Sequence, residues 1–197
     1  MPARPLVYIV RHGQTGWNAD YRLQGQADTD INALGRSQAD VNGRLLRGLI
    51  PSPEAFDFVA SPLRRTRETM ERIRTAMELD PHAYSTDPRL VELHFGDWQG
   101  FTYAEVEDRA PGSTEERHVD KWNFRPPGEK AESYAMLAER VRPLLDEIAR
   151  PTVCVTHGGI VRSLFVLVAG MPEIEAAAMD VPQDRVLRMD SGRLEWL

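Results

Sequence analysis

The stretch YIVRHGQTGWN, residues 8–18, passes directly from an apolar run into two basic side chains and a glycine. The apolar run begins at Leu6 and has the length of a buried strand. Arg11 and His12 follow at the point where such a strand leaves the core, and Gly13 permits a sharp turn there. Two basic groups at one strand end predict either a structural carboxylate partner or a bound anion.

Composition and charge narrow the class of protein. The 197 residues suit a single domain, 1–197, and the contents of 42% hydrophobic and 27% charged residues are typical of globular proteins. The net charge of −6 argues against nucleic-acid and membrane partners, because both favour a concentrated basic face. Cys154 is the only cysteine, and no apolar run has the length of a signal-peptide core or a membrane span. We therefore expect a cytoplasmic location.

Strand-like apolar runs alternate with helical patterns along the chain. The strand-like runs are residues 5–10, 56–60 and 152–156, with a weaker pair near 185–189 and 193–197. Apolar residues at helical spacing predict helices over 33–49, 63–79 and 132–149. The alternation predicts an α/β fold, in which a mainly parallel sheet is covered on both faces as a three-layer α/β/α sandwich.

Residues 107–130, EDRAPGSTEERHVDKWNFRPPGEK, differ from the rest of the chain. They are polar, rich in proline and glycine, and show no hydrophobic period. One interpretation is a solvated connection. Unstructured stretches of this length inside a compact domain are uncommon, however, and often serve as lids or binding loops. Trp122 and Phe124 give the stretch apolar surface to bury, so we expect a loop or lid beside the functional site.

Three of the strand-like runs are followed by residues suited to binding. They end in Arg11-His12-Gly13, in Ser61-Pro62-Leu63-Arg64 and in His157-Gly158-Gly159. In open parallel sheets, ligands bind beyond the carboxyl ends of the strands. We therefore expect these strand ends to bring together Arg11, His12, Arg64 and His157.

Local signals at two predicted helix starts support an anion site. Ser61 before Pro62 is typical of a helix cap with proline in the first helical position, which places Arg64 in the first turn. Gly158 and Gly159 allow a helix to begin directly after a strand, with unpaired backbone N–H groups that attract anions. Each signal is weak alone, since a single strand-end arginine is more often a salt-bridge partner. Together they predict a phosphate-sized pocket.

Other phosphate chemistries lack their motifs. No glycine-rich loop with Lys and Ser/Thr is present, which excludes a nucleotide P-loop. Ile160 stands where a cysteine phosphatase using Cys154 would need an arginine. The Asp28-Thr29-Asp30 stretch lacks the preceding apolar strand of an aspartate nucleophile, and no His or carboxylate cluster has metal-ligand spacing. A histidine is the remaining candidate nucleophile, and we expect no metal.

Five motifs are spread along nearly the whole chain: RHGQTGWN (11–18), LQGQADTDINALGRSQA (23–39), ASPLRRTRET (60–69), LVELHFGDWQG (90–100) and VTHGGIVR (155–162). In this order they resemble the histidine phosphatase superfamily, also called the phosphoglycerate mutase-like family. The resemblance implies one domain of that fold, with 107–130 as a substrate-side loop or lid. It also implies hydrolysis of a small phosphomonoester through a phosphohistidine, without metal or cofactor.

The resemblance implies a role for each matching position. His12 matches the residue that accepts the phosphoryl group, and Glu92 matches the acid that protonates the leaving group. The other members of the phosphate pocket match Arg11, Arg64 and His157, and further substrate contacts match Asn18, Gln24, Gly25 and Gly158. These roles suit the side chains, because imidazole titrates near neutral pH and the planar guanidinium group fits phosphate oxygens.

The family includes phosphatases and mutases, and residues 92–96 favour a phosphatase. They read ELHFG, without the arginine of the ERHYG motif of cofactor-dependent phosphoglycerate mutases, and FGDWQG resembles the phosphatase branch. A cofactor-dependent phosphoglycerate mutase is the alternative, and a low-turnover binding module on the same fold is a second. The implied partner is a small phosphorylated substrate. Both a monomer and a homo-oligomer fit the sequence.

Overall fold

The computed structural model describes residues 5–197, so residues 1–4 of the predicted domain lie outside the described part. The strands are β1 (Val7–Arg11), β2 (Asp57–Ala60), β3 (Ser85–Thr86), β4 (Thr152–Thr156), β5 (Val186–Asp190) and β6 (Arg193–Trp196). The helices are α1 (Gly16–Ala19), α2 (Ala33–Leu49), α3 (Arg64–Ala76), α4 (Tyr103–Arg109), α5 (Ser113–Val119), α6 (Tyr134–Glu147), α7 (Gly158–Ala169) and α8 (Glu173–Ala178). Short 3₁₀ helices are η1 (Pro53–Ala55), η2 (Pro88–Leu90) and η3 (Gly96–Trp98). None of the helices in residues 5–197 has the length and apolar character needed to cross a membrane.

The strands form one sheet with the order β3-β2-β4-β1-β5-β6. Strand β4 pairs in parallel with both β1 and β2, and β2 pairs in parallel with β3, whereas β5 runs antiparallel to β1 and β6. Arg11 is opposite Thr156, and Ala60 is opposite Val155. The carboxyl ends of β1, β2 and β4 therefore lie side by side, which is where ligands bind in such sheets.

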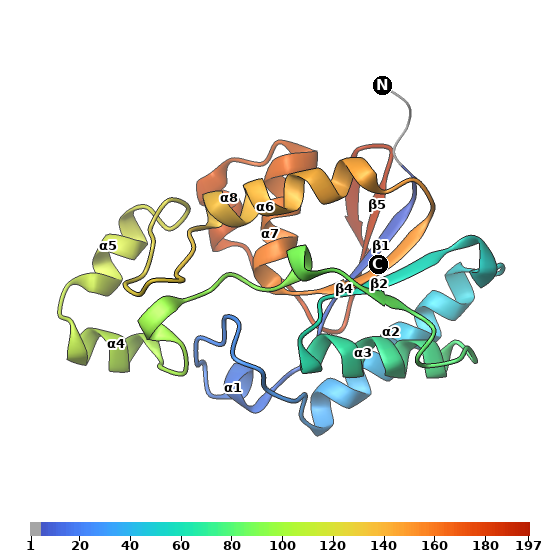
Figure 1. Cartoon of the computed structure of the whole chain (residues 1–197), viewed down its shortest axis with the longest axis horizontal. Coiled ribbons are helices and arrows are strands. Elements are labelled where there is room, and N and C mark those ends of the chain that lie inside the picture. The colour runs from blue at the N-terminus through green and yellow to red at the C-terminus, as the bar shows by residue number, and fades with distance from the viewer. Residues whose placement is uncertain (1–4) are drawn as a thin grey trace.

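Helices cover both faces of the sheet, as Figure 1 shows. Alternate residues of β1 enter two separate cores, because side chains alternate between the faces of a strand. Val7 and Ile9 pack with residues of α6 and α7, whereas Tyr8 and Val10 pack with residues of α2 and α3. The predicted three-layer α/β/α sandwich with a mainly parallel sheet is confirmed.

Gly13 is required by close packing between the turn after β1 and the start of α2. A Cβ atom on Gly13 would lie 2.2 Å from the carbonyl oxygen of Gly35, and one on Gly35 would lie 2.2 Å from that of Gln14. The Gly13 N–H also donates to the Thr69 hydroxyl at 3.1 Å. The glycine of the Arg-His-Gly sequence thus lets α2 and α3 approach the end of β1.

Residues 107–130 contain more regular structure than their sequence predicts. Residues 107–109 complete α4, and residues 113–119 form α5, so the prediction of an irregular connection is wrong for these two ranges. Each helix has seven residues, too few to display a hydrophobic period. Helix α4 begins with a capping box between Thr102 and Glu105. Figure 1 shows both helices at one end of the molecule, beyond the layers around the sheet.

Candidate active site

The His12 side chain is buried at the end of β1 and held in one tautomer by its neighbour. Its Nδ1 atom lies 2.8 Å from the carbonyl oxygen of Gly13, which can only accept, so the proton belongs on Nδ1. Nε2 is then unprotonated and accepts a hydrogen bond from Nε of Arg65 at 3.2 Å. Burial and the charges of Arg65 and Arg11 lower the pKa of His12 well below its usual range. A neutral imidazole with an unprotonated Nε2 is suited to nucleophilic attack.

Arg65, rather than Arg64, brings its guanidinium group to His12. Arg65 is 0% exposed, and its Nη1 and Nη2 atoms each donate to a backbone carbonyl oxygen at 2.7 Å. The Arg64 side chain is 61% exposed and pairs with Asp30 at 2.8 Å. The prediction that Arg64 joins the cluster is therefore wrong, and the adjacent arginine takes its place.

The geometry of α3 explains this error. The sequence at 61–62 predicts a helix with proline in its first turn, but α3 begins only at Arg64. Consecutive helical residues point about 100° apart, so only one of two adjacent arginines can face the strand ends. Arg65 shares the buried face with Thr69 and Ile73, four and eight residues further on. This spacing is the sequence signal that could have distinguished the two arginines.

Arg11 lies beside the start of α7 with one buried donor unpaired. Its Nη1 atom donates to the carbonyl oxygen of Val181 at 2.6 Å, whereas its buried Nε atom has no partner among the described residues. Burial and the charge of Arg162 lower the pKa of Arg11 to about 10. A Cβ atom on Gly158 would lie 3.5 Å from this Nε atom, so glycine keeps the adjacent space open. A phosphate oxygen could accept this hydrogen bond and offset the cost of burying the donor.

His157, which follows β4, lies next to His12. The two ring centroids are 5.1 Å apart, and the rings meet at 61°. Its Nε2 atom lies 2.8 Å from the Ser61 hydroxyl oxygen, and its buried Nδ1 atom has no partner within residues 5–197. Burial and the charge of Arg65 lower the pKa of His157 well below its usual range. Ser61 therefore orients His157 instead of capping α3.

The Glu92 carboxylate lies at the N-terminus of α7. One oxygen accepts a hydrogen bond from the Leu93 N–H at 2.8 Å, and both lie 3.1 Å from the Gly159 nitrogen. A Cβ atom on Gly159 would lie 2.2 Å from Glu92 Oε1, so glycine is needed for this approach. The charge of Glu92 raises the pKa of Arg11 and Arg65 against the lowering effect of burial. The acidic side chain therefore belongs to the same cluster.

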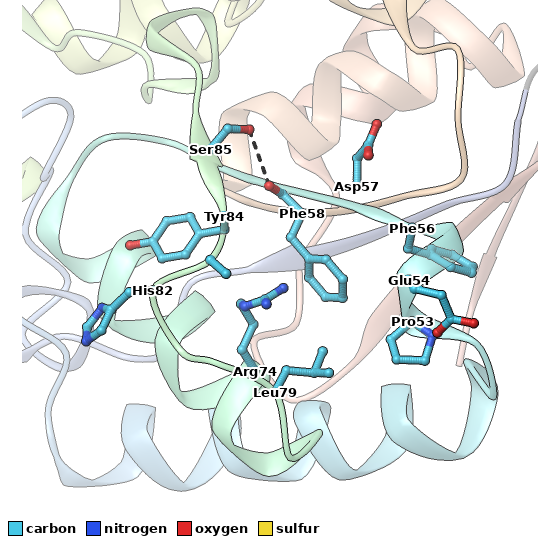
Figure 2. A pocket seen from close by; sticks show the side chains of 11 residues that line it. Pro53, Glu54, Phe56, Asp57, Phe58, Arg74, Leu79, His82, Tyr84 and Ser85 are labelled. Atoms are coloured by element: carbon cyan, nitrogen blue, oxygen red, sulfur yellow. Dashed lines mark hydrogen bonds between the residues drawn. The ribbon is translucent and has the colours of Figure 1, made fainter.

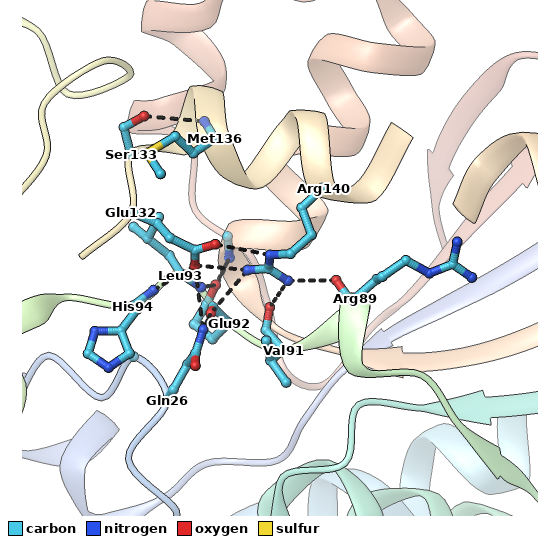
Figure 3. Close-up of polar contacts among 12 residues, drawn as sticks. Gln26, Arg89, Val91, Glu92, Leu93, His94, Glu132, Ser133, Met136 and Arg140 are labelled. Atoms are coloured by element: carbon cyan, nitrogen blue, oxygen red, sulfur yellow. Dashed lines mark hydrogen bonds and ion pairs between the residues drawn. The ribbon is translucent and has the colours of Figure 1, made fainter. Parts of the chain in front are cut away.

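An ion pair fixes the backbone that carries Glu92, as Figure 3 shows. Arg140 on α6 donates through Nη1 to the carbonyl oxygens of Arg89 and Val91, at 2.7 and 3.0 Å. Arg140 also pairs with Glu132 at 2.9 Å, and both side chains are only about one-fifth exposed (21% and 17%). Neither residue of this pair is among the predicted site residues. Their contacts position the segment before α4 without forming part of the His12 cluster.

Asn18 is joined to His12 through a third side chain. Its Oδ1 atom accepts a hydrogen bond from the Gln183 amide at 3.1 Å, and the same amide nitrogen donates to the His12 carbonyl oxygen at 3.0 Å. Gln183 is not among the predicted residues, because it lies in an irregular segment before β5 without a motif. The structure thus places Asn18 at the edge of the cluster.

Gln24 and Gly25 lie in the chain segment whose backbone carbonyl oxygens hold Arg65. The Gly25 carbonyl oxygen accepts the Arg65 Nη2 hydrogen bond at 2.7 Å, and a φ of +52° favours glycine at this position. Gln24 is buried, and its Oε1 atom accepts a hydrogen bond from the Thr29 hydroxyl at 2.8 Å. Direct contact of either residue with substrate stays a prediction. The predicted residues that the structure brings together around one point are Arg11, His12, Glu92, His157 and Gly158.

Positive charge at the strand ends comes from Arg65, which is buried, and from Arg11, which is half-buried. Neither Arg11 nor Arg65 makes a hydrogen bond to a carboxylate within residues 5–197, and burial lowers the pKa of Arg65 to about 10. In the described part of the chain, no three His, Cys, Asp or Glu side chains form a group that could hold a metal ion. Buried cations without an ion-pair partner are costly, so this cluster favours a bound anion over a structural carboxylate.

A separate hollow of about 660 Å³ is shown in Figure 2. Its lining includes Arg74, whose guanidinium group lies 4.4 Å from the centre of the Phe58 ring. Asp57 and Phe58 begin β2, whereas Ser61 follows the end of that strand beside His157. The hollow therefore lies at the opposite end of β2 from the His12 cluster and contains none of the predicted site residues.

Lowering the pH below about 6.5 is expected to destabilise the protein through His12 and His157. Their pKa values are lowered by folding, so the unfolded chain binds protons there that the folded chain does not. The free energy of unfolding then falls by up to about 1.4 kcal/mol per pH unit for each histidine. Urea unfolding at pH 7.5 and 5.5 measures this loss. His157→Asn should reduce the pH dependence of the free energy of unfolding, whereas the control His82→Asn, at an exposed site, should not. An equal free energy of unfolding at both pH values in the wild type would contradict the expectation.

The family model for the histidine phosphatase superfamily (branch 1) matches residues 7–196. The chain belongs to this superfamily, which confirms the predicted resemblance. It is a phosphoric monoester hydrolase, a histidine phosphatase acting on a small phosphorylated metabolite.

Relatives with assigned activities support this class. A glucosyl-3-phosphoglycerate phosphatase from Mycolicibacterium vanbaalenii is 37% identical over 184 residues, covering 87% of this chain and 77% of the relative. A metal-independent phosphoserine phosphatase from Arabidopsis thaliana is 32% identical over 165 residues, covering 81% and 67%. A mycobacterial glucosyl-3-phosphoglycerate phosphatase solved with VO3 superimposes with a TM-score of 0.80 at 31% identity, covering 98% of both chains.

Proposed function

We propose that this phosphatase transfers the phosphoryl group of its substrate to His12 Nε2 and then to water. The observation that carries the proposal is the 2.8 Å distance between His12 Nδ1 and the Gly13 carbonyl oxygen, which assigns the ring proton to Nδ1 and leaves Nε2 unprotonated. In the first step, Nε2 attacks phosphorus, the bond to the ester oxygen breaks, and Glu92 donates its proton to that oxygen. In the second step, water attacks phosphorus, Glu92 takes the released proton, and the phosphorus–nitrogen bond breaks.

The surrounding donors would stabilise charge on the phosphoryl oxygens. Arg65 already lies 3.2 Å from the attacking atom, and the unpaired Nε atom of Arg11 offers a second donor. The unpaired Nδ1 atom of His157 can offer a third when it carries a proton. Asn18 and the Gly158 backbone complete the proposed contacts. Preorganised donors of this kind account for much of phosphoryl-transfer catalysis, because little reorganisation is needed during the reaction.

Trapping of the phosphoenzyme tests the proposal. The protein is mixed with an aryl phosphate in the presence of EDTA and quenched within milliseconds, and bound phosphate is then assayed for stability. Wild-type protein and His82→Asn should carry phosphate that is labile to acid and stable to alkali, whereas His12→Asn should carry none and lose turnover. Turnover without phosphate on His12 would refute the mechanism. Slow discharge to water but rapid discharge to added 3-phosphoglycerate would instead favour the mutase alternative.

The same proposal treats residues 1–197 as one domain with 107–130 on the substrate side. Arg117 in this stretch lies 5.9 Å from the ring of Phe95, three residues after Glu92. This contact supports a position of α5 near the proposed acid. A cytoplasmic location is also proposed, supported by the buried free thiol of Cys154.

A further inference from the structure

The irregular segment between α8 and β5 supports two members of the His12 cluster. The Val181 carbonyl oxygen accepts the Arg11 Nη1 hydrogen bond at 2.6 Å. Two residues further on, the Gln183 side-chain nitrogen donates to the His12 carbonyl oxygen at 3.0 Å. The Gln183 carbonyl oxygen in turn accepts a hydrogen bond at 3.0 Å from Asn42 on α2, which is 1% exposed. The backbone of Gln183 is therefore anchored to a buried side chain.

The contacts of Gln183 leave its side-chain amide one orientation. A backbone carbonyl oxygen can only accept a hydrogen bond, so the atom that faces the His12 carbonyl must be the amide nitrogen Nε2. This nitrogen carries two hydrogens, and the second donates to Asn18 Oδ1 at 3.1 Å. Gln183 therefore presents a donor, and not an acceptor, to Asn18.

Asn18 is held in the matching orientation from a second side. Its Oδ1 atom also accepts a hydrogen bond from the Thr15 N–H at 3.2 Å, and Thr15 is 0% exposed. A backbone N–H can only donate, so the oxygen of the Asn18 amide has to face Thr15 and Gln183. The other amide atom of Asn18, Nδ2, makes no hydrogen bond within residues 5–197. Asn18 thus has a free donor on the side of its amide that faces neither contact.

We propose that Gln183 is a positioning residue, which keeps the Nδ2 atom of Asn18 available to the phosphoryl group. This role rests on the proposed function, in which Asn18 contacts the phosphoryl oxygens. If the Asn18 amide were reversed, its oxygen would face the negatively charged group, and Nδ2 would face the donors of Gln183 and Thr15. Two donors that face each other leave both without a partner, which is costly where water is excluded. Gln183 in this way directs a donor toward phosphate without touching it.

A double-mutant cycle with Gln183→Met and Asn18→Ala tests whether Gln183 acts through Asn18. Methionine has nearly the size of glutamine but cannot donate a hydrogen bond. We expect Gln183→Met to weaken the binding of orthovanadate, a tetrahedral anion shaped like phosphate, and to lower kcat/KM for an aryl phosphate. Each effect should be about 10-fold, the lower end of the effect of losing a hydrogen bond to a charged group. In the Asn18→Ala background, the same change should have little further effect. Calorimetric titration measures the binding of vanadate, and steady-state hydrolysis gives kcat/KM.

Gln38→Met on α2 is a matched control. Gln38 is also half-buried, and its Oε1 atom accepts a hydrogen bond from the Gln14 N–H at 2.9 Å, two residues after His12. This change removes one hydrogen bond from the same turn without altering the contacts of Asn18, so vanadate binding and kcat/KM should stay near their wild-type values. If Gln183→Met does not fold, Gln183→Glu keeps the size and shape of glutamine but cannot donate. It should weaken vanadate binding at least as much, and thermal unfolding checks the folding of each variant.

The same loss in Gln183→Met and in Gln38→Met would overturn the positioning role. A full additional loss for Gln183→Met in the Asn18→Ala background would overturn it as well, because Gln183 would then act independently of Asn18. The proposed function fails separately if wild-type protein binds vanadate but hydrolyses no aryl phosphate, and the vanadate cycle still tests Gln183 in that case. If wild-type protein does not bind vanadate, both proposals fail.

Discussion

Arg65→Met is expected to lower kcat/KM by about 10²- to 10³-fold, the effect of removing one preorganised donor from a developing negative charge. Arg64→Met should leave kcat/KM nearly unchanged. The reason is that Arg65 Nε donates to the attacking atom of His12 at 3.2 Å, whereas Arg64 extends into solvent and pairs with Asp30. Steady-state hydrolysis of an aryl phosphate by the two variants measures the difference.

Folding has to be separated from chemistry in this comparison. Arg65 also holds the carbonyl oxygens of Gly25 and Ala27, so its loss could loosen the chain between α1 and α2. Thermal unfolding of both variants and a third variant, Arg65→Lys, which retains charge without the planar fork, address this point. Loss of activity in Arg64→Met with full activity in Arg65→Met would show that the free structure does not represent the catalytic arrangement of α3.

Glu92→Gln is expected to slow the hydrolysis of an alkyl phosphate by about 10²- to 10⁴-fold, because a poor leaving group needs a proton from the acid. The first step should be affected much less with an aryl phosphate, whose leaving group departs without protonation. Because Glu92 also accepts the proton of water in the proposed second step, phosphoenzyme should accumulate. Rapid-quench measurements should then show a burst of aryl alcohol followed by slow turnover.

Glu132→Gln provides a matched control for this experiment. Glu132 pairs with Arg140, which holds the carbonyl oxygens of Arg89 in η2 and of Val91 directly before Glu92, but Glu132 lies outside the His12 cluster. Disturbing this pair should reduce the rates for alkyl and aryl phosphates by similar factors and without a burst. The same leaving-group dependence in both variants would argue that Glu92 is not the proton donor. Equal losses on both substrates in Glu92→Gln, without a burst, would have the same meaning.

Much of the architecture follows from local sequence patterns. The continuous apolar runs that became β1 and β4 predict strands covered on both faces, and helix α2 spans the predicted residues 33–49. The proximity of His12 and His157 is also predictable, because the parallel neighbouring strands β1 and β4 bring their carboxyl ends to the same edge of the sheet. By contrast, α4 and α5 are too short to produce a readable period, and β3 has only two residues.

The sequence by itself determined the class of fold, the strand ends at which the site forms, and the presence of histidine and arginine there, whereas Glu92 was implied by the family resemblance. These properties depend on hydrophobic periodicity and on residues adjacent to strand ends, which are local. Only the tertiary structure decided that Arg65 replaces Arg64, that Ser61 holds His157, and that Arg117 is buried with no ion-pair partner among residues 5–197. Each of these depends on the direction of a side chain relative to a distant segment. For the two arginines, the rotation of about 100° between neighbouring helical residues decides which side chain faces His12.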